Sequence, residues 1–401
     1  MSTMAAVSQV RFGTKWSADA ALKGAARFWF VLAVLGQLVF AFSIASFYIS
    51  TAARGELSQW NKFMTHGNVA GQPIGNGVVV VHLVGVVLLI VCGALQLVPQ
   101  VLRRAPKFHR WNGRVYLVSA LSLSAAGMYM LWVRGTVGGL GVHMATTTNV
   151  VLIWVCAGMA LRYALQRDFK RHRAWALRLY VVSLGGWFIR VLFPLWIVVF
   201  RGPLGVDLTT LTGPGLLILT YGEYLVPLAA VELYLRAQAR PGAARRWAAA
   251  VVLFVLTLGM ATGTVLATAG SWVPTTKIAF DSRKPISDVL DATIKQSGLA
   301  AAVAQYRALK TTAQATYNFD ESQLNDFGYV LLRAKKYPEA IGILALNVEA
   351  YPKSANVYDS LGEAYMDAGD RAEAIANYRR SVEMNPKSSG GRKMLERLGV
   401  R

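Results

Sequence analysis

Apolar residues are concentrated in seven long runs in the first two thirds of the chain. After residue 270 they recur at helical spacing among polar residues. Each run is long enough to cross a bilayer, which takes about 20 predominantly apolar residues. The pattern predicts an all-α chain, with a seven-helix transmembrane bundle followed by a soluble helical domain. The predicted spans are 27–50, 77–98, 113–133, 143–165, 176–200, 213–235 and 247–270.

The same pattern predicts four segments. A cytoplasmic tail (1–26) precedes the transmembrane domain (27–270), whose core helices lie within 77–200. A linker (271–286) then leads to an extracytoplasmic helical repeat domain (287–401). The composition, 54% hydrophobic and 16% charged, excludes a disordered chain and a simple cytosolic enzyme, because soluble domains carry about 25% charged residues.

Positive charge is concentrated in the membrane half. The net charge is +21, and residues 1–270 hold 24 Lys or Arg against 6 Asp or Glu, whereas residues 271–401 hold 18 against 15. Basic loops alternate with loops poor in Lys and Arg, as the positive-inside rule describes. We therefore expect lipid rather than nucleic acid as the partner of these charges. The expected location is a bacterial inner membrane, with the N-terminus cytoplasmic and the C-terminal domain extracytoplasmic.

The soluble domain contains an internal repeat of 34 residues, 321–354 and 355–388. Small residues and prolines recur at this period and resemble those of the tetratricopeptide repeat. The resemblance implies stacked helix pairs, with a third helical unit near 287–314 and a capping helix near 388–398. The matched packing positions are Gly328, Ala340, Pro352, Gly362, Ala374 and Pro386.

The repeat domain is predicted to bind a protein or peptide. It contains no His, no Ser-x-x-Lys motif and no Gly-x-Ser-x-Gly elbow. The absence of these motifs favours binding over catalysis in this half. Whether the whole chain is an enzyme stays open. Stacked helix pairs leave a concave groove lined by the first helix of each pair. Five polar residues are expected in or beside it, either as ligand contacts or as ordinary solvated residues: Asn325, Tyr329, Asp359, Glu363 and Tyr365.

Four of the five histidines lie near the ends of four consecutive predicted spans. His82 and His143 are expected near the outer face, and His109 and His172 near the inner face. The inner segments "HRWNGRVY" and "HRAWALRLY" read alike, which indicates a duplicated helical hairpin. Histidines flanked by Arg and Trp also suit the headgroup level of a bilayer. The positions therefore leave an interfacial role and a ligand role open.

Residues 77–237 resemble the uncharacterised multi-pass membrane family called domain of unknown function 2306. The resemblance rests on the stretches "HLVGVVLLIVCGALQLVPQVLRRAPKFHRWNGRVYLVSALSLSAAGMYM", "RDFKRHRAWALRLYVVSLGGWFIRVLFPLW" and "VELYLR". It implies a fold and a membrane location, and no established activity. The positions that match the family are His82, His109, Arg114, His172, Arg178, Arg190 and Glu232.

The placement of the histidines also resembles that of the transmembrane di-haem cytochrome b family. That resemblance implies haem b between His82 and His143 on the outer side and between His109 and His172 on the inner side. Axial ligation by two imidazoles would hold each haem. Nothing else in the sequence indicates a cofactor, and transmembrane electron transfer is one alternative function.

Charged residues are expected deep inside the bundle. Arg190 and Glu223 fall near the middle of their spans, where a charge costs about 2.5–3.5 kcal/mol on insertion scales. They form either an ion pair that locks two helices or a transporter-like polar cavity. Glu232, nearer the inner end, is expected to pair with Arg178 or Arg236, and Arg114 lies near the inner boundary.

Overall fold

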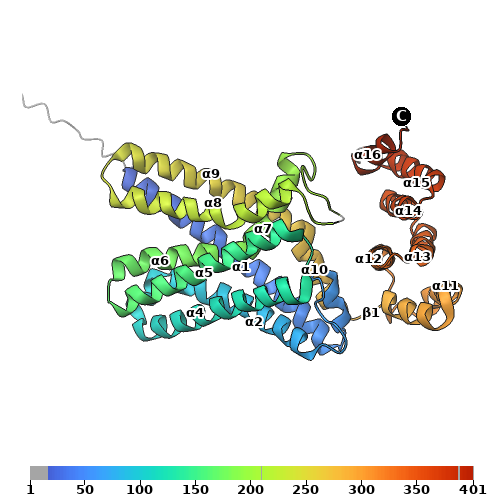
Figure 1. The fold of residues 1–401 in the computed structure, drawn as a ribbon, viewed down its shortest axis with the longest axis horizontal. Helices are drawn as coiled ribbons and strands as arrows, with labels where there is room; N and C mark the ends of the chain where they lie inside the picture. The colour runs from blue at the N-terminus through green and yellow to red at the C-terminus, as the bar shows by residue number, and fades with distance from the viewer. Residues whose placement is uncertain (1–16, 209, 387–388, 401) are drawn as a thin grey trace, which may run out of the picture. The chain divides into compact units, whose positions relative to one another are not determined.

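The structure is a computed structural model that describes residues 17–208, 210–386 and 389–400. The chain divides into two compact units, Met1–Phe280 and Asp281–Arg401, which Figure 1 shows in blue to yellow and in orange to red. The expected tail (1–26) is helical from Ala18 onward, and its residues 1–16 lie outside the described residues.

The first unit consists of long helices that lie alongside one another (Figure 1). Among the described residues, six of them are long and apolar enough to cross a membrane, and the bent pair α6–α7 makes a seventh if it forms one span. The chain is therefore a multi-pass membrane protein. Its elements are α1 Ala18–Ala53, η1 Leu57–Lys62, α2 Pro73–Gln96, α3 Pro99–Arg104, α4 Pro106–Tyr129, η2 Met130–Gly135, α5 Gly139–Leu165, α6 Phe169–Val182, α7 Gly185–Val199, α8 Pro214–Ala239, α9 Ala243–Ala267, η3 Thr268–Trp272 and α10 Val273–Phe280.

Two features of this unit differ from the sequence pattern. The last span continues through η3 and α10 to Phe280, so most of the segment expected as a linker is helical. The fifth span, expected as one helix over 176–200, is broken by a bend of 53° between α6 and α7. The break falls just before Gly185 and Gly186, and adjacent small residues are a common cause of helix kinks.

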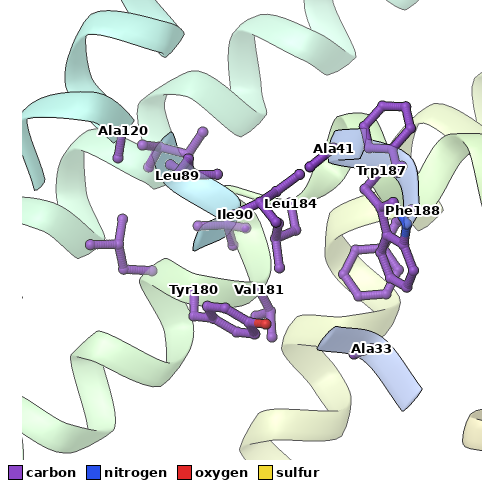
Figure 2. Close-up of a cluster of buried hydrophobic side chains, with 14 of the residues drawn as sticks. Ala33, Ala41, Leu89, Ile90, Ala120, Tyr180, Val181, Leu184, Trp187 and Phe188 are labelled. Atoms are coloured by element: carbon purple, nitrogen blue, oxygen red, sulfur yellow. The ribbon is translucent and has the colours of Figure 1, made fainter. Parts of the chain in front are cut away.

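The core of the bundle is built around this bend. Tyr180, Val181 and Leu184 pack with Trp187 and Phe188 against residues of α1, α2 and α4 (Figure 2). The outer surface is apolar as well: Ile74 and Leu165 are 76% and 75% exposed. Exposed apolar side chains on every long helix are expected where lipid, rather than water, is the solvent.

The second unit is a stack of helices, as predicted. Its elements are β1 Lys284–Pro285, α11 Ile286–Thr312, β2 Tyr317–Asn318, α12 Glu321–Arg333, α13 Tyr337–Ala350, α14 Ala355–Asp367, α15 Arg371–Met384 and α16 Ser389–Arg397. The two 34-residue repeats become the pairs α12–α13 and α14–α15, each with a helix of 13 residues followed by one of 14. The two pairs thus have matching helix lengths at matching spacing, as a structural repeat requires.

The helix α11 is itself a folded-back pair. Gly298, at φ 82° and ψ 174°, interrupts it, and Thr293 Oγ1 lies 2.5 Å from Gln305 Oε1. These residues are twelve apart and would lie about 18 Å apart along a continuous helix. The second half of α11 packs on α13, because a Cβ on Gly342 would lie 2.5 Å from Leu299 Cδ2. The unit thus holds three helix pairs, and α16 follows them.

Candidate functional site

The repeat pairs close through small residues at matched positions. A Cβ on Gly328 would lie 2.5 Å from Leu344 Cγ, and one on Gly362 would lie 3.1 Å from Tyr378 Cδ1. The paired helices therefore approach more closely than any other residue allows. Ala340 and Ala374 are fully buried. Pro352 follows α13 and Pro386 follows α15, where proline cannot continue a helix.

The first helices of the two repeats are joined by polar contacts. The hydroxyl of Tyr329 on α12 donates to Glu363 Oε2 on α14 at 2.7 Å and also contacts Ser360 Oγ at 3.4 Å. Asp359 and Asn325 each have one buried side-chain oxygen without a hydrogen-bond partner among the described residues. We call the surface of α12 and α14 formed by Asn325, Tyr329, Asp359, Glu363 and Asp367 the α12/α14 face.

Tyr365, also expected in the groove, lies elsewhere. Its ring packs against the hydrophobic core of the unit, and its hydroxyl lies within electrostatic range of Glu373 and Asp370 on the next helix. Asp367 takes its place on the α12/α14 face. Spacing could have identified Asp367, because residues 359, 363 and 367 are four apart and share one side of a helix.

The carboxylates of this face are partly removed from water. Burial raises the pKa of Asp359, Glu363 and Asp367 above their usual ranges. The neighbouring Asp367 and Asp359 raise the pKa of Glu363 further, and the hydrogen bond from Tyr329 opposes that rise. The face therefore holds negative charge that its own surroundings stabilise poorly.

In the membrane unit, the inner charged residues form an ion pair. Arg178 Nε on α6 lies 2.5 Å from Glu232 Oε1 on α8, so Arg178 rather than Arg236 is the partner of Glu232. The Arg178 guanidinium also lies 4.7 Å above the ring of Trp175, as Arg114 lies 4.8 Å above Trp111. The ion pair ties α6 to α8, whereas each Arg–Trp contact lies within one helix.

The deeper charges gather at the break between α6 and α7. A Cβ on Gly185 would lie 2.8 Å from Asn149 Nδ2 and 3.0 Å from Glu223 Oε1. Both polar side chains come from other helices, α5 and α8, and both residues are 7% exposed. Asn149 Oδ1 is buried without a hydrogen-bond partner among the described residues. Glycine at the start of α7 thus leaves room for polar groups at this level.

Arg190 lies one turn further along α7. Its Nη1 donates to the Gly186 carbonyl at 2.5 Å, and its guanidinium lies 5.3 Å above the Phe40 ring. It interacts electrostatically with Tyr48, His82 and Glu223, on three other helices. Across the described part of the chain no direct ion pair joins Arg190 and Glu223. Their charges are close but not in contact, and Arg190 is exposed.

These polar residues share one depth. Contacts between Arg134 and Asn76 and between Gly139 and Thr212 show that the starts of α2, α5 and α8 lie at the same end of the bundle. The four residues His82, Asn149, Arg190 and Glu223 each lie nine or ten residues from that end, or about 14 Å at 1.5 Å per residue. We call them the polar layer.

The outer histidines both lie against the segment 123–136. His82 lies near the Leu123 backbone and beside Gly127, and its Nδ1 is buried without a hydrogen-bond partner among the described residues. His143 contacts Thr136 Oγ1 at 3.4 Å through Nε2, and its ring meets that of Trp132 edge to face. Both histidine rings have contacts within the protein, and haem between them stays a prediction.

The inner histidines lie closer together. His109 and His172 are within electrostatic range of each other, and His172 Nδ1 lies 2.9 Å from the Ala160 carbonyl. A carbonyl at Nδ1 orients an imidazole so that Nε2 is free for a ligand. Haem at this pair stays a prediction. The fifth histidine, His66, contacts the Gly135 carbonyl.

The two similar inner segments also pack alike. Tyr116 and Tyr180 close their respective segments, and both rings meet the same residue, since a Cβ on Gly93 would lie 2.9 Å from one and 3.1 Å from the other. Equivalent tyrosines on either side of one glycine, together with the two Arg–Trp contacts, are what a duplicated hairpin predicts.

Comparisons with known proteins identify both halves. Residues 79–221 match the family described as "Predicted membrane protein (DUF2306)", and residues 355–388 match the tetratricopeptide repeat. The resemblances to domain of unknown function 2306 and to the tetratricopeptide repeat are confirmed, although Glu232 lies beyond the matched range.

Superkiller complex protein 3 is 34% identical over 61 residues in Homo sapiens and over 62 in Mus musculus, which is 15% and 16% of this chain. The chain spans about 4% of the length of these curated relatives.

Proposed function

We propose that this membrane protein binds a segment of a partner protein at the α12/α14 face of its repeat unit. The observation that carries the proposal is the hydrogen bond from Tyr329 to Glu363 across two repeats. It places polar side chains from both repeats on one continuous surface. The repeat type is one that generally serves protein interaction, and its concave surface is formed by the first helices of the pairs.

The membrane unit would anchor this face at the outer surface of a bacterial inner membrane. The distribution of Lys and Arg supports this, because it favours a cytoplasmic N-terminus. Seven spans, with the bent pair α6–α7 taken as one, would put the two ends of the chain on opposite sides. A repeat unit fixed to the membrane in this way would recruit an extracytoplasmic partner.

Site-specific photo-cross-linking in intact cells tests the proposal. A photoreactive amino acid is placed at Tyr329 or Asp367 on the face and, as matched controls, at Arg380 or Glu383 on α15. We expect a discrete cross-linked partner from positions 329 and 367 and none from 380 and 383. Equal yields from all four positions, or no product from the face, would overturn the proposal.

A second candidate function is a proton or solute site in the polar layer. The observation that favours it is Arg190, which interacts electrostatically with groups on α1, α2 and α8 without a direct ion pair to Glu223 among the described residues. A pair serving only to lock helices would be in direct contact and buried. Ionisable residues inside a membrane commonly mark substrate or proton pathways, and interrupted helices commonly form such sites.

Proton flux in vesicles tests this second function. The full chain is reconstituted with a pH-sensitive dye inside the vesicles, and the outside pH is stepped. We expect flux that Glu223→Gln and Arg190→Gln abolish and that Glu232→Gln, at the inner ion pair, leaves in place. Flux at the level of empty vesicles, or equal flux in all variants, would contradict proton movement through the polar layer.

A further inference from the structure

The helix α14 presents a row of carboxylates within the α12/α14 face. Asp359, Glu363 and Asp367 are spaced four residues apart and line one side of the helix. The sequence of α14 contains no Lys or Arg, although residues 271–401 as a whole hold 18 Lys or Arg against 15 Asp or Glu. Negative charge is therefore concentrated on this helix within a unit that is slightly basic.

A second, independent feature lies near the same row. Tyr378 on α15 is 1% exposed, and its hydroxyl has no hydrogen-bond partner among the described residues. The hydroxyl lies within electrostatic range of Asp359, Glu363 and Asp367. A buried phenol without a partner is costly, so its place beside three carboxylates indicates a site that is completed by a ligand.

Among the described residues, no ion pair joins a Lys or Arg to Asp359, Glu363 or Asp367. The hydrogen bond to Glu363 comes from the neutral hydroxyl of Tyr329, and Asp359 Oδ1 faces Gly391 at the start of α16. Nearby ion pairs, such as Arg307–Glu349 and Arg380–Glu383, use other carboxylates. Burial leaves the three carboxylates with raised pKa values, and the neighbouring Asp367 and Asp359 add to the rise at Glu363. A bound cation would offset this cost.

We infer that the α12/α14 face recognises a cationic peptide segment, whose Lys or Arg side chains lie along Asp359, Glu363 and Asp367. This inference rests on the proposed function and specifies its partner. A carboxylate row repeats about every 6 Å along a helix, close to the spacing of alternate side chains in an extended strand, about 6.6–6.8 Å. Tyr329 and Asn325 then remain for polar contacts with the peptide backbone.

Three fluorescent peptides of one design test the inference on the full chain in nanodiscs. Each is about ten residues long, or at most roughly 35 Å when extended, with alternating Ser and a variable residue, which is Lys, Gln or Glu. Binding is followed by fluorescence anisotropy. We expect the Lys peptide to bind, the Glu peptide not to bind, and affinity for the Lys peptide to fall as salt is raised.

Two charge-neutralising variants provide the matched comparison. Glu363→Gln keeps an oxygen that can accept from Tyr329, and with Asp367→Asn it removes two charges from the row. Glu383→Gln removes one charge from the exposed side of α15 and serves as the control. We expect the double variant to weaken binding of the Lys peptide by about tenfold or more and the control to leave it unchanged. Equal affinity in the double variant and the control would overturn the inference.

The peptide series distinguishes a failure of the cationic specificity from a failure of the proposed function. Binding of the Gln or Glu peptide as tight as that of the Lys peptide, lost in Tyr329→Ala, would refute the cationic specificity and leave the proposed function standing. Failure of all three peptides to bind at concentrations approaching 1 mM would count against the proposed function as well, because weak peptide complexes fall within that range.

Discussion

The two units of this protein reach their functional residues in different ways. In the repeat unit, the α12/α14 face comes from residues 325–367, two consecutive repeats whose register is visible in the sequence. In the membrane unit, the polar layer draws on α2, α5, α7 and α8, with residues between 82 and 223. The surface residues of a local repeat can be predicted from their spacing in the sequence. The members of a layer assembled from distant helices can be identified only from how those helices pack.

Close helix packing in the membrane unit is expected to give the largest effect. A Cβ on Gly263 of α9 would lie 2.3 Å from the Val191 carbonyl oxygen, a backbone atom that cannot move aside. We expect Gly263→Val to destabilise the unit by about 1–3 kcal/mol or more. Gly158→Val is the control, since a Cβ there meets nothing within 4 Å. Equal melting temperatures for the two variants in detergent would contradict this packing.

The inner ion pair should give a smaller effect. Glu232→Gln leaves Arg178 partly buried, at 20% side-chain exposure, without its carboxylate. We expect a loss of about 1–2 kcal/mol, less than for a fully buried pair. Glu383→Gln, in an exposed pair of the repeat unit, should cost under about 0.5 kcal/mol. Thermal unfolding of the two variants compares the partly buried ion pair with the exposed one. Similar losses of stability would contradict the expected difference between them.

The pH dependence of the repeat unit should follow its carboxylate row. Because burial raises the pKa of Asp359, Glu363 and Asp367, the folded unit holds more protons than the unfolded chain just above the usual carboxyl range. The contribution of these groups to stability is thus full below about pH 4 and is lost as pH rises through the raised pKa values. We expect the double variant Glu363→Gln, Asp367→Asn to flatten this fall, measured by melting across pH. An unchanged slope would argue against buried charge at the row.

The smallest effect is expected at the outer histidines. Because Nε2 of His143 already contacts Thr136, whereas His172 is held through Nδ1 with Nε2 left for a ligand, any b-type haem band in a reduced-minus-oxidised spectrum should survive His143→Ala and be lost in His172→Ala. A band lost in both variants would restore an outer haem. A colourless protein purified from haem-replete cells would remove the haem hypothesis for the inner pair too.

The fold could largely be predicted from the sequence, and the reasons are local. Runs of apolar residues gave the spans, and Gly328, Gly362 and the prolines at 352 and 386 gave the repeats. The bend before Gly185 was missed because the apolar run continues across it, and α10 was missed because its polar residues resemble a linker. Hydropathy indicates the environment of a segment, but it carries no information about the direction of the helix axis.

The candidate sites were harder to predict. The pairing of Arg178 with Glu232 was one of two options that spacing allowed, and only packing distinguishes them. The distance between Arg190 and Glu223, and the turn of Tyr365 into the core, depend on helix rotation. The role of Tyr378 could not be predicted, because a buried tyrosine at this position is typical of ordinary repeat packing.

Cysteine accessibility in intact cells tests the central claim most directly. The native Cys92 and Cys156 are buried in the membrane unit, so a single cysteine is introduced at Asp367, on the face, or at Arg380, on α15. We predict that a membrane-impermeant maleimide labels position 380 from outside, and position 367 much more slowly, with equal rates in the purified protein. Labelling of 380 only after permeabilisation, or equal rates at both positions in cells, would contradict an occupied extracytoplasmic binding face.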